Sequence, residues 1–106
     1  MQNQKNSNYK TGGIGKIMAM TFYRKVPFSF EEKIYEIRVF YDDKNINIVA
    51  FRNNYPANGF RHQVKISKTV AVEQILKHKV INELIEICKK DISEKRWERL
   101  LTINHN

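Results

Sequence analysis

The stretch KIYEIRVFYDDKNINIVAFRNNYPANGFRHQVKIS, residues 33–67, decides the fold. Near its end, every second residue from Phe60 to Ile66 is apolar except His62, and polar residues stand between them. Since successive side chains on a strand point to opposite faces, this alternation predicts a strand with one buried and one solvated face.

Two β-rich runs precede this strand, residues 34–41 and 46–52. The second run carries apolar residues on both faces, which indicates the central strand of the sheet. Residues 42–45 predict a tight hairpin, because Asp and Asn hydrogen-bond their own backbone in turns. Residues 53–59 then form a longer loop, in which Gly59 accepts a positive φ.

The residues before this meander predict a fourth strand and a tail. Thr, Phe and Tyr favour a strand over residues 20–24. We expect Pro27 to end it, because proline has no amide proton, and Phe28 and Phe30 to supply rings to the core. Residues 1–15 are polar and glycine-rich without a hydrophobic period, which predicts a disordered tail.

After the third strand, the hydrophobic period changes from two to about 3.6 residues. This change predicts one long helix over about residues 70–90 with Thr69 as its cap, and a break near His78 is the alternative. Asp91 with the following residues is typical of a new N-cap, so a shorter helix is expected over about residues 92–101.

These elements predict an α+β fold: an antiparallel meander of three to four strands with one long and one short C-terminal helix packed on one face. With 106 residues there is room for one domain, expected over residues 16–103. No apolar run approaches the ~20 residues that cross a bilayer, and no signal peptide is visible. With a single cysteine as well, we expect a cytoplasmic protein with no membrane partner.

The reactive residue types form no arrangement that names a reaction. Cys88 stands alone at a helical core position, and the histidines are not spaced for metal chelation. The sequence therefore predicts no catalytic residue, no metal site and no cofactor, and it favours a protein that is not an enzyme. His62 is open to two interpretations: a core histidine, or a polar spot in a pocket between sheet and helix.

The net charge of +8 raises the question of nucleic-acid binding. Residues 1–30 hold five lysines and arginines and no acidic residue, so most of the excess lies in this N-terminal part. In the meander, basic groups stand beside an aromatic one, as a phosphate backbone with stacked bases requires. The candidate nucleic-acid-binding residues are Arg38, Arg52, Tyr55, Arg61 and Lys65.

Two functions remain open from the sequence. The first is a small non-enzymatic protein that acts through protein–protein interaction, with a homodimer as one form. It rests on apolar residues at outward strand positions that something must cover: Ile34, Phe40, Val49 and Phe51. The alternative is a nucleic-acid-binding module that uses a basic sheet face and the basic N-terminal arm.

Overall fold

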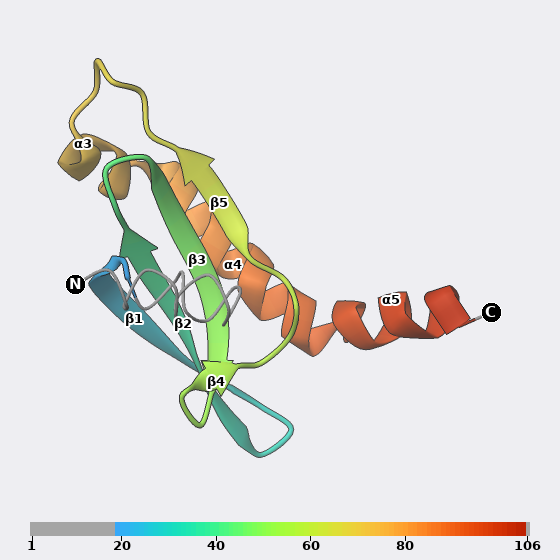
Figure 1. Ribbon diagram of the computed structural model, residues 1–106. Helices are drawn as coiled ribbons and strands as arrows, with labels where there is room; N and C mark the ends of the chain where they lie inside the picture. Colours follow the sequence, from blue (N-terminus) through green and yellow to red (C-terminus); the bar gives the residue numbers. More distant parts are fainter. Residues whose placement is uncertain (1–18, 106) are drawn as a thin grey trace, which may run out of the picture.

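The computed structural model describes residues 19–105, and its ribbon is shown in Figure 1. Strands come first and helices follow, which confirms the predicted α+β fold with an antiparallel sheet. In chain order the described elements are β1 (Thr21–Phe30), β2 (Lys33–Tyr41), β3 (Asn45–Arg52), β4 (Tyr55–Pro56), β5 (His62–Lys65), α3 (Val72–Leu76), α4 (Lys79–Ser93) and α5 (Arg96–His105). The predicted tail of residues 1–15 lies outside the described residues.

The sheet is antiparallel in the order β1-β2-β3, and both β4 and β5 pair with the remaining side of β3. β5 pairs with the first half of β3, and β4 pairs with its last two residues. β3 is buried from Ile46 to Phe51. The prediction of a central strand is therefore confirmed.

Short turns fix the register of the strands. Glu31–Glu32 joins β1 to β2, and Asn53–Asn54 joins β3 to β4, each with positive φ at both residues. Two-residue turns of this kind match the twist of the paired strands. In the predicted hairpin between β2 and β3, Oδ1 of Asp42 accepts from the backbone N–H of Lys44 and of Asn45, both at 2.8 Å.

β1 is longer than the sequence predicts. It runs from Thr21 to Phe30, so the expectation that Pro27 ends the strand is wrong. β1 is an edge strand of the described sheet. Proline is tolerated at such an edge, where a missing N–H does not break the interior ladder. Phe28 and Phe30 pack against the main core, as expected.

The helical region begins with a break. α3 and α4 are separate, so the alternative with a break at His78 is confirmed and the uninterrupted helix is wrong. His78 is the N-cap of α4, and its Nδ1 accepts from the backbone N–H of Val80 at 3.1 Å. The N-cap of α3 is Ala71 and not Thr69 as predicted. The hydroxyl of Thr69 is instead hydrogen-bonded to the hydroxyl of Ser67.

The C-terminal helices divide at a different place from the one predicted. α4 continues through Ser93, so Asp91 is not the cap of a new helix but a buried residue of α4. Lys95 adopts a left-handed φ of 53° between the two helices. α5 then runs from Arg96 to His105, beyond the predicted end of the short helix.

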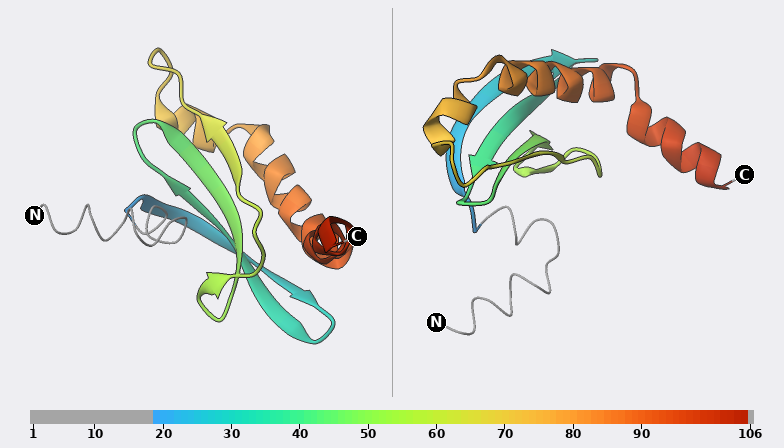
Figure 2. Two further views of the ribbon diagram at one scale, coloured as in Figure 1. Left: turned by 45° about the vertical axis from the view of Figure 1, so that its right-hand side comes forward. Right: turned by 90° about the horizontal axis from the view of Figure 1, so that it is seen from above.

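α4 packs across one face of the sheet (Figure 1), and α5 extends beyond the sheet (Figure 2). The main core lies between α4 and this face. Its buried residues are Ile37, Val39, Ile46, Ile48, Ala50, Leu76, Ile81, Ile85, Cys88 and Ile92. No described helix is long and apolar enough to span a bilayer.

Gly59 contacts the first turn of α5. A Cβ atom built at this position would overlap the ring of Trp97, which also meets Phe60 edge-on with ring centroids 5.2 Å apart. The φ of Gly59 lies outside the left-handed region, so the predicted reason for the glycine is wrong. Close approach of the Trp97 ring, and not backbone conformation, requires a glycine here.

Candidate functional site

The sheet has a second face, opposite α4, on which no helix of residues 19–105 lies (Figure 2). Residues that pair directly across strands share a face. We call this surface the outer face. By this pairing it comprises Phe22, Lys25, Pro27, Ser29, Ile34, Glu36, Arg38, Phe40, Asn45, Asn47, Val49, Phe51, Gln63 and Lys65. The alternation of side chains along β5 extends it to Arg61, the residue before this strand.

Two of the five residues predicted to bind nucleic acid, Arg38 and Lys65, share the outer face through strand pairing, and the alternation along β5 assigns Arg61 to the same face. Arg38 lies on β2 and Arg61 directly precedes β5, on the two sides of the central strand. Arg52 and Tyr55 pair with each other at the β3–β4 hairpin and have the opposite strand parity. The structure therefore brings part of the predicted set together and separates the rest.

Arg38 occupies the centre of the outer face. Its Nε and Nη2 donate to Oε1 of Glu36 at 2.9 and 2.7 Å, and Nη2 also donates to Oδ1 of Asn54 at 2.8 Å. The guanidinium carbon lies 4.4 Å from the centroid of the Phe51 ring. Such stacking is attractive because the ring face carries negative potential.

Glu36 is the carboxylate of this centre. Nζ of Lys25 lies 3.4 Å from its second oxygen, Oε2. The hydrogen bonds from Arg38, and after them the contact with Lys25, hold the pKa of Glu36 below its ordinary value of 4.5. The carboxyl group of Glu36 is therefore ionised at neutral pH.

An apolar cluster lies beside this network. Phe40, Val49 and Phe51 are only 9%, 2% and 6% exposed, although they face away from α4. Met20 packs against the cluster, and the ring of Phe22 meets that of Phe40 edge-on with centroids 5.8 Å apart. The outer face thus has an apolar cluster of its own beside the charged network, and three of the outward apolar residues of the sequence form it.

Two hollows flank the pair formed by Arg38 and Glu36. One has a volume of about 210 Å³, and besides the pair its lining residues are Ile34, Phe51, Asn53 and Asn54. The other has a volume of about 360 Å³, and besides the pair its lining residues are Phe22, Lys25 and Phe40. Ile34 and Phe22 are 70% and 51% exposed, so each hollow has an apolar wall open to solvent.

Asn47 belongs to the outer face and was not singled out in the sequence. Its side chain is fully buried; Nδ2 donates to Sδ of Met20 at 3.1 Å, and Oδ1 accepts from Nε2 of Gln63 at 3.3 Å. A buried amide is costly unless it is hydrogen-bonded. Its position between Ile46 and Ile48 was the available signal, because a polar residue interrupts a run that is otherwise apolar.

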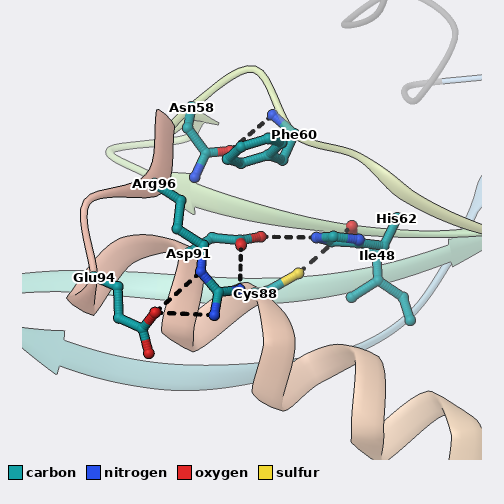
Figure 3. A network of polar contacts seen from close by, with 8 residues as sticks. All are labelled: Ile48, Asn58, Phe60, His62, Cys88, Asp91, Glu94 and Arg96. Carbon is teal, nitrogen blue, oxygen red and sulfur yellow. Dashed lines mark hydrogen bonds and ion pairs between the residues drawn. The ribbon is translucent and has the colours of Figure 1, made fainter. Parts of the chain in front are cut away.

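A second polar cluster lies on the α4 side of the sheet (Figure 3). Nε2 of His62 lies 2.8 Å from Oδ2 of Asp91, whose Oδ1 accepts from Nη1 of Arg96 at 3.1 Å. Arg96 also donates to Glu94. The hydrogen bond to Asp91 makes the largest contribution and the bond to Glu94 the next, and both raise the pKa of Arg96 above its ordinary value. Through this contact with Asp91, His62 joins β5 to the α4–α5 junction.

Cys88 lies next to this cluster. Its thiol donates to the backbone carbonyl of Ile48 at a sulfur–oxygen distance of 3.7 Å. Burial, with a smaller contribution from the charge of Asp91, raises the pKa of Cys88 to about 12. The thiol stays protonated at neutral pH, so it has no thiolate for nucleophilic attack.

A hollow of about 180 Å³ opens beside Asp91 at the end of α4. Its charged lining mixes both signs: Lys33 and Lys95 stand beside Glu31, Asp91 and Glu98, and Nζ of Lys95 lies 3.4 Å from Oε2 of Glu31. Asp91 is already bonded to His62 and Arg96, so the lining selects no single class of ionic ligand. Nor do residues 19–105 contain a group of three or more side chains placed to hold a metal ion.

The outer face is thus the candidate functional site: it combines exposed apolar walls, two hollows and an excess of cations. Comparison of the chain with protein-family models, with curated proteins and with solved structures found no match.

Proposed function

We propose that this protein is a non-enzymatic binding protein that acts through protein–protein interaction at the outer face. The observation that carries the proposal is the placement of two exposed apolar side chains, Phe22 and Ile34, beside the two hollows that flank Arg38. Aromatic residues and arginine are enriched where proteins bind proteins, with polar groups around the apolar centre.

The state of the buried reactive groups supports a non-enzymatic role. Cys88 is protonated in the core, and both oxygens of Asp91 are bonded, one to His62 and one to Arg96. General acid–base or nucleophilic catalysis needs a group that can reach a substrate and exchange a proton with it. The cluster around Asp91 instead connects three elements of the fold.

The partner can be a second copy of the chain or a different protein. The single cysteine is free and buried, which fits a reducing compartment, so we place the interaction in the cytoplasm. Light scattering of the purified protein distinguishes the two kinds of partner: a dimer that the double variant Phe22→Asp/Ile34→Asp dissociates would identify the partner as a second copy.

Comparative affinity purification tests the proposal. Tagged wild-type protein, the Phe22→Asp/Ile34→Asp variant and the Ile103→Asp variant are recovered from cells, and their co-purifying proteins are quantified. Ile103 is a matched control, because it is 67% exposed on α5. The proposal predicts a protein that is lost with the double variant and retained with Ile103→Asp. Equal recovery by all three contradicts it.

Nucleic-acid binding is the second candidate, and a separate observation favours it. Arg38, Arg61 and Lys65 share the outer face with the exposed ring of Phe22. Cations that follow a phosphate backbone, with a ring for base stacking, are what single-stranded nucleic acid requires. The basic N-terminal arm of this proposal lies outside the described residues.

Fluorescence anisotropy with mixed-sequence single-stranded oligonucleotides tests this second candidate. Each phosphate contact should add ~0.7 to the slope of log affinity against log salt. Arg61→Ala should reduce the slope by about that amount, whereas Arg52→Ala, of the opposite strand parity, should leave it unchanged. Absence of binding at low salt, or equal effects of the two variants, counts against nucleic acid.

A further inference from the structure

We infer that the outer face binds an acidic protein segment that carries aromatic or aliphatic side chains. This inference rests on the proposed function and adds the chemistry of the partner. Three features carry it: the charge balance of the face, the size of its hollows and the net charge of the chain.

The charge balance of the outer face is positive. It holds four cations, Lys25, Arg38, Arg61 and Lys65, and one carboxylate, Glu36. That carboxylate already accepts from Arg38 and lies beside Lys25. Arg61 and Lys65 make no ion pair within residues 19–105. The face thus leaves cations without a counter-charge, and a partner with carboxylates would complement them.

The two hollows accept side chains and not a whole small ligand. Their volumes, about 210 and 360 Å³, fall below or at the low end of the ~300–1,000 Å³ usual for ligand pockets. Each hollow has two apolar lining residues, Ile34 and Phe51 in one and Phe22 and Phe40 in the other, and its remaining lining residues are polar or charged. An apolar anchor on each side of Arg38 therefore fits the shape, and carboxylates between or beside the anchors would meet the cations.

The net charge of the chain favours an acidic segment over a second folded copy. A second copy would bring its own net charge of +8 against a basic surface. An acidic segment of another protein brings the opposite charge.

Selection from a random peptide library displayed on phage tests the inference. The full-length protein is the bait, and the enriched peptides are synthesised and their affinities measured by fluorescence anisotropy. We expect enriched peptides to be net acidic and to contain at least two aromatic or aliphatic residues. Because charged groups at an exposed interface contribute modestly each, the double reversal Arg61→Glu/Lys65→Glu should weaken binding roughly tenfold. Phe22→Asp/Ile34→Asp should weaken it at least as much.

Arg52→Glu is the matched control, because Arg52 is exposed but has the opposite strand parity. It should leave the affinity of the peptides essentially unchanged. Circular dichroism of each variant verifies folding, which exposed substitutions should preserve. Enriched peptides that are neutral or basic, yet lose affinity with the outer-face variants, overturn the acidic partner while leaving the proposed function standing. Peptides that bind all variants equally, or no enrichment at all, overturn both.

Discussion

Gly59 shows how a single residue can depend on a contact distant in the sequence. A side chain at this position would occupy the space of the Trp97 ring. Gly59→Ala should therefore lower the free energy of unfolding by ~1–3 kcal/mol, the usual cost of overpacking. Urea denaturation measures this loss. In a Trp97→Ala background the same substitution should cost much less, and an equal cost in both backgrounds would contradict the assigned contact.

Glu36 provides a prediction about pH at the same scale. Its folded pKa lies below the ordinary value of 4.5, with the Arg38 hydrogen bonds as the main cause. A lowered carboxyl pKa contributes stability that is present above the unfolded value and is lost as pH falls through the folded value. Wild type should therefore exceed Glu36→Gln in thermal midpoint at neutral pH, and the difference should shrink below about pH 4.5. Glu83→Gln, exposed on α4, is the control; a difference independent of pH would refute the prediction.

Asp91 is the third residue with a measurable consequence. It is 4% exposed and bonded to both His62 and Arg96. Asp91→Asn keeps the size of the side chain but removes its charge, which leaves these partners poorly satisfied, so unfolding should become easier by ~1–3 kcal/mol. Glu94→Gln, which also contacts Arg96 but is 48% exposed in its side chain, should change stability by less than about 0.5 kcal/mol. Similar losses from both variants would exclude a special role for Asp91.

The local hydrophobic pattern of the sequence predicted the strands and helices well where residue propensity and burial favour the same secondary structure. The alternation before Ser67 gave the strands, and the change of period after it gave the helices. Pro27 and Asp91 were misjudged for one reason: their roles depend on position in the sheet and on distant partners. An edge strand tolerates proline, and Asp91 stays inside a helix because His62 and Arg96 satisfy it.

At the scale of secondary-structure elements, the break between α3 and α4 can be tested by mutation. His78 accepts from the backbone N–H of Val80 and so satisfies a donor at the start of α4. His78→Ala should cost ~0.5–2 kcal/mol in unfolding free energy, as loss of an N-cap usually does. His78→Ser, which restores a capping oxygen, should recover most of the loss. No difference between the two variants would show that capping does not determine stability here.

For the whole molecule, the architecture followed from the sequence, but the site followed only in part. Outward apolar residues such as Val49 and Phe51 pointed to a second covered surface, and the basic residues pointed to charge. Strand register decides which of these residues meet, and no local pattern encodes it. The register placed Arg38 and Lys65 on one face of the sheet and Arg52 on the other. The hollows also depend on this register, so the sequence could not predict them.

Nuclear magnetic resonance of the labelled full-length protein, titrated with an acidic peptide from the display selection, tests the central claim most directly. The assignment of binding to the outer face predicts backbone shift changes that concentrate at Phe22, Ile34, Arg38 and Arg61. Amides of α4 that face away from the sheet should move little. Shift changes that centre on α4 or α5, with β1 and β2 unaffected, would show that the protein binds through a different surface.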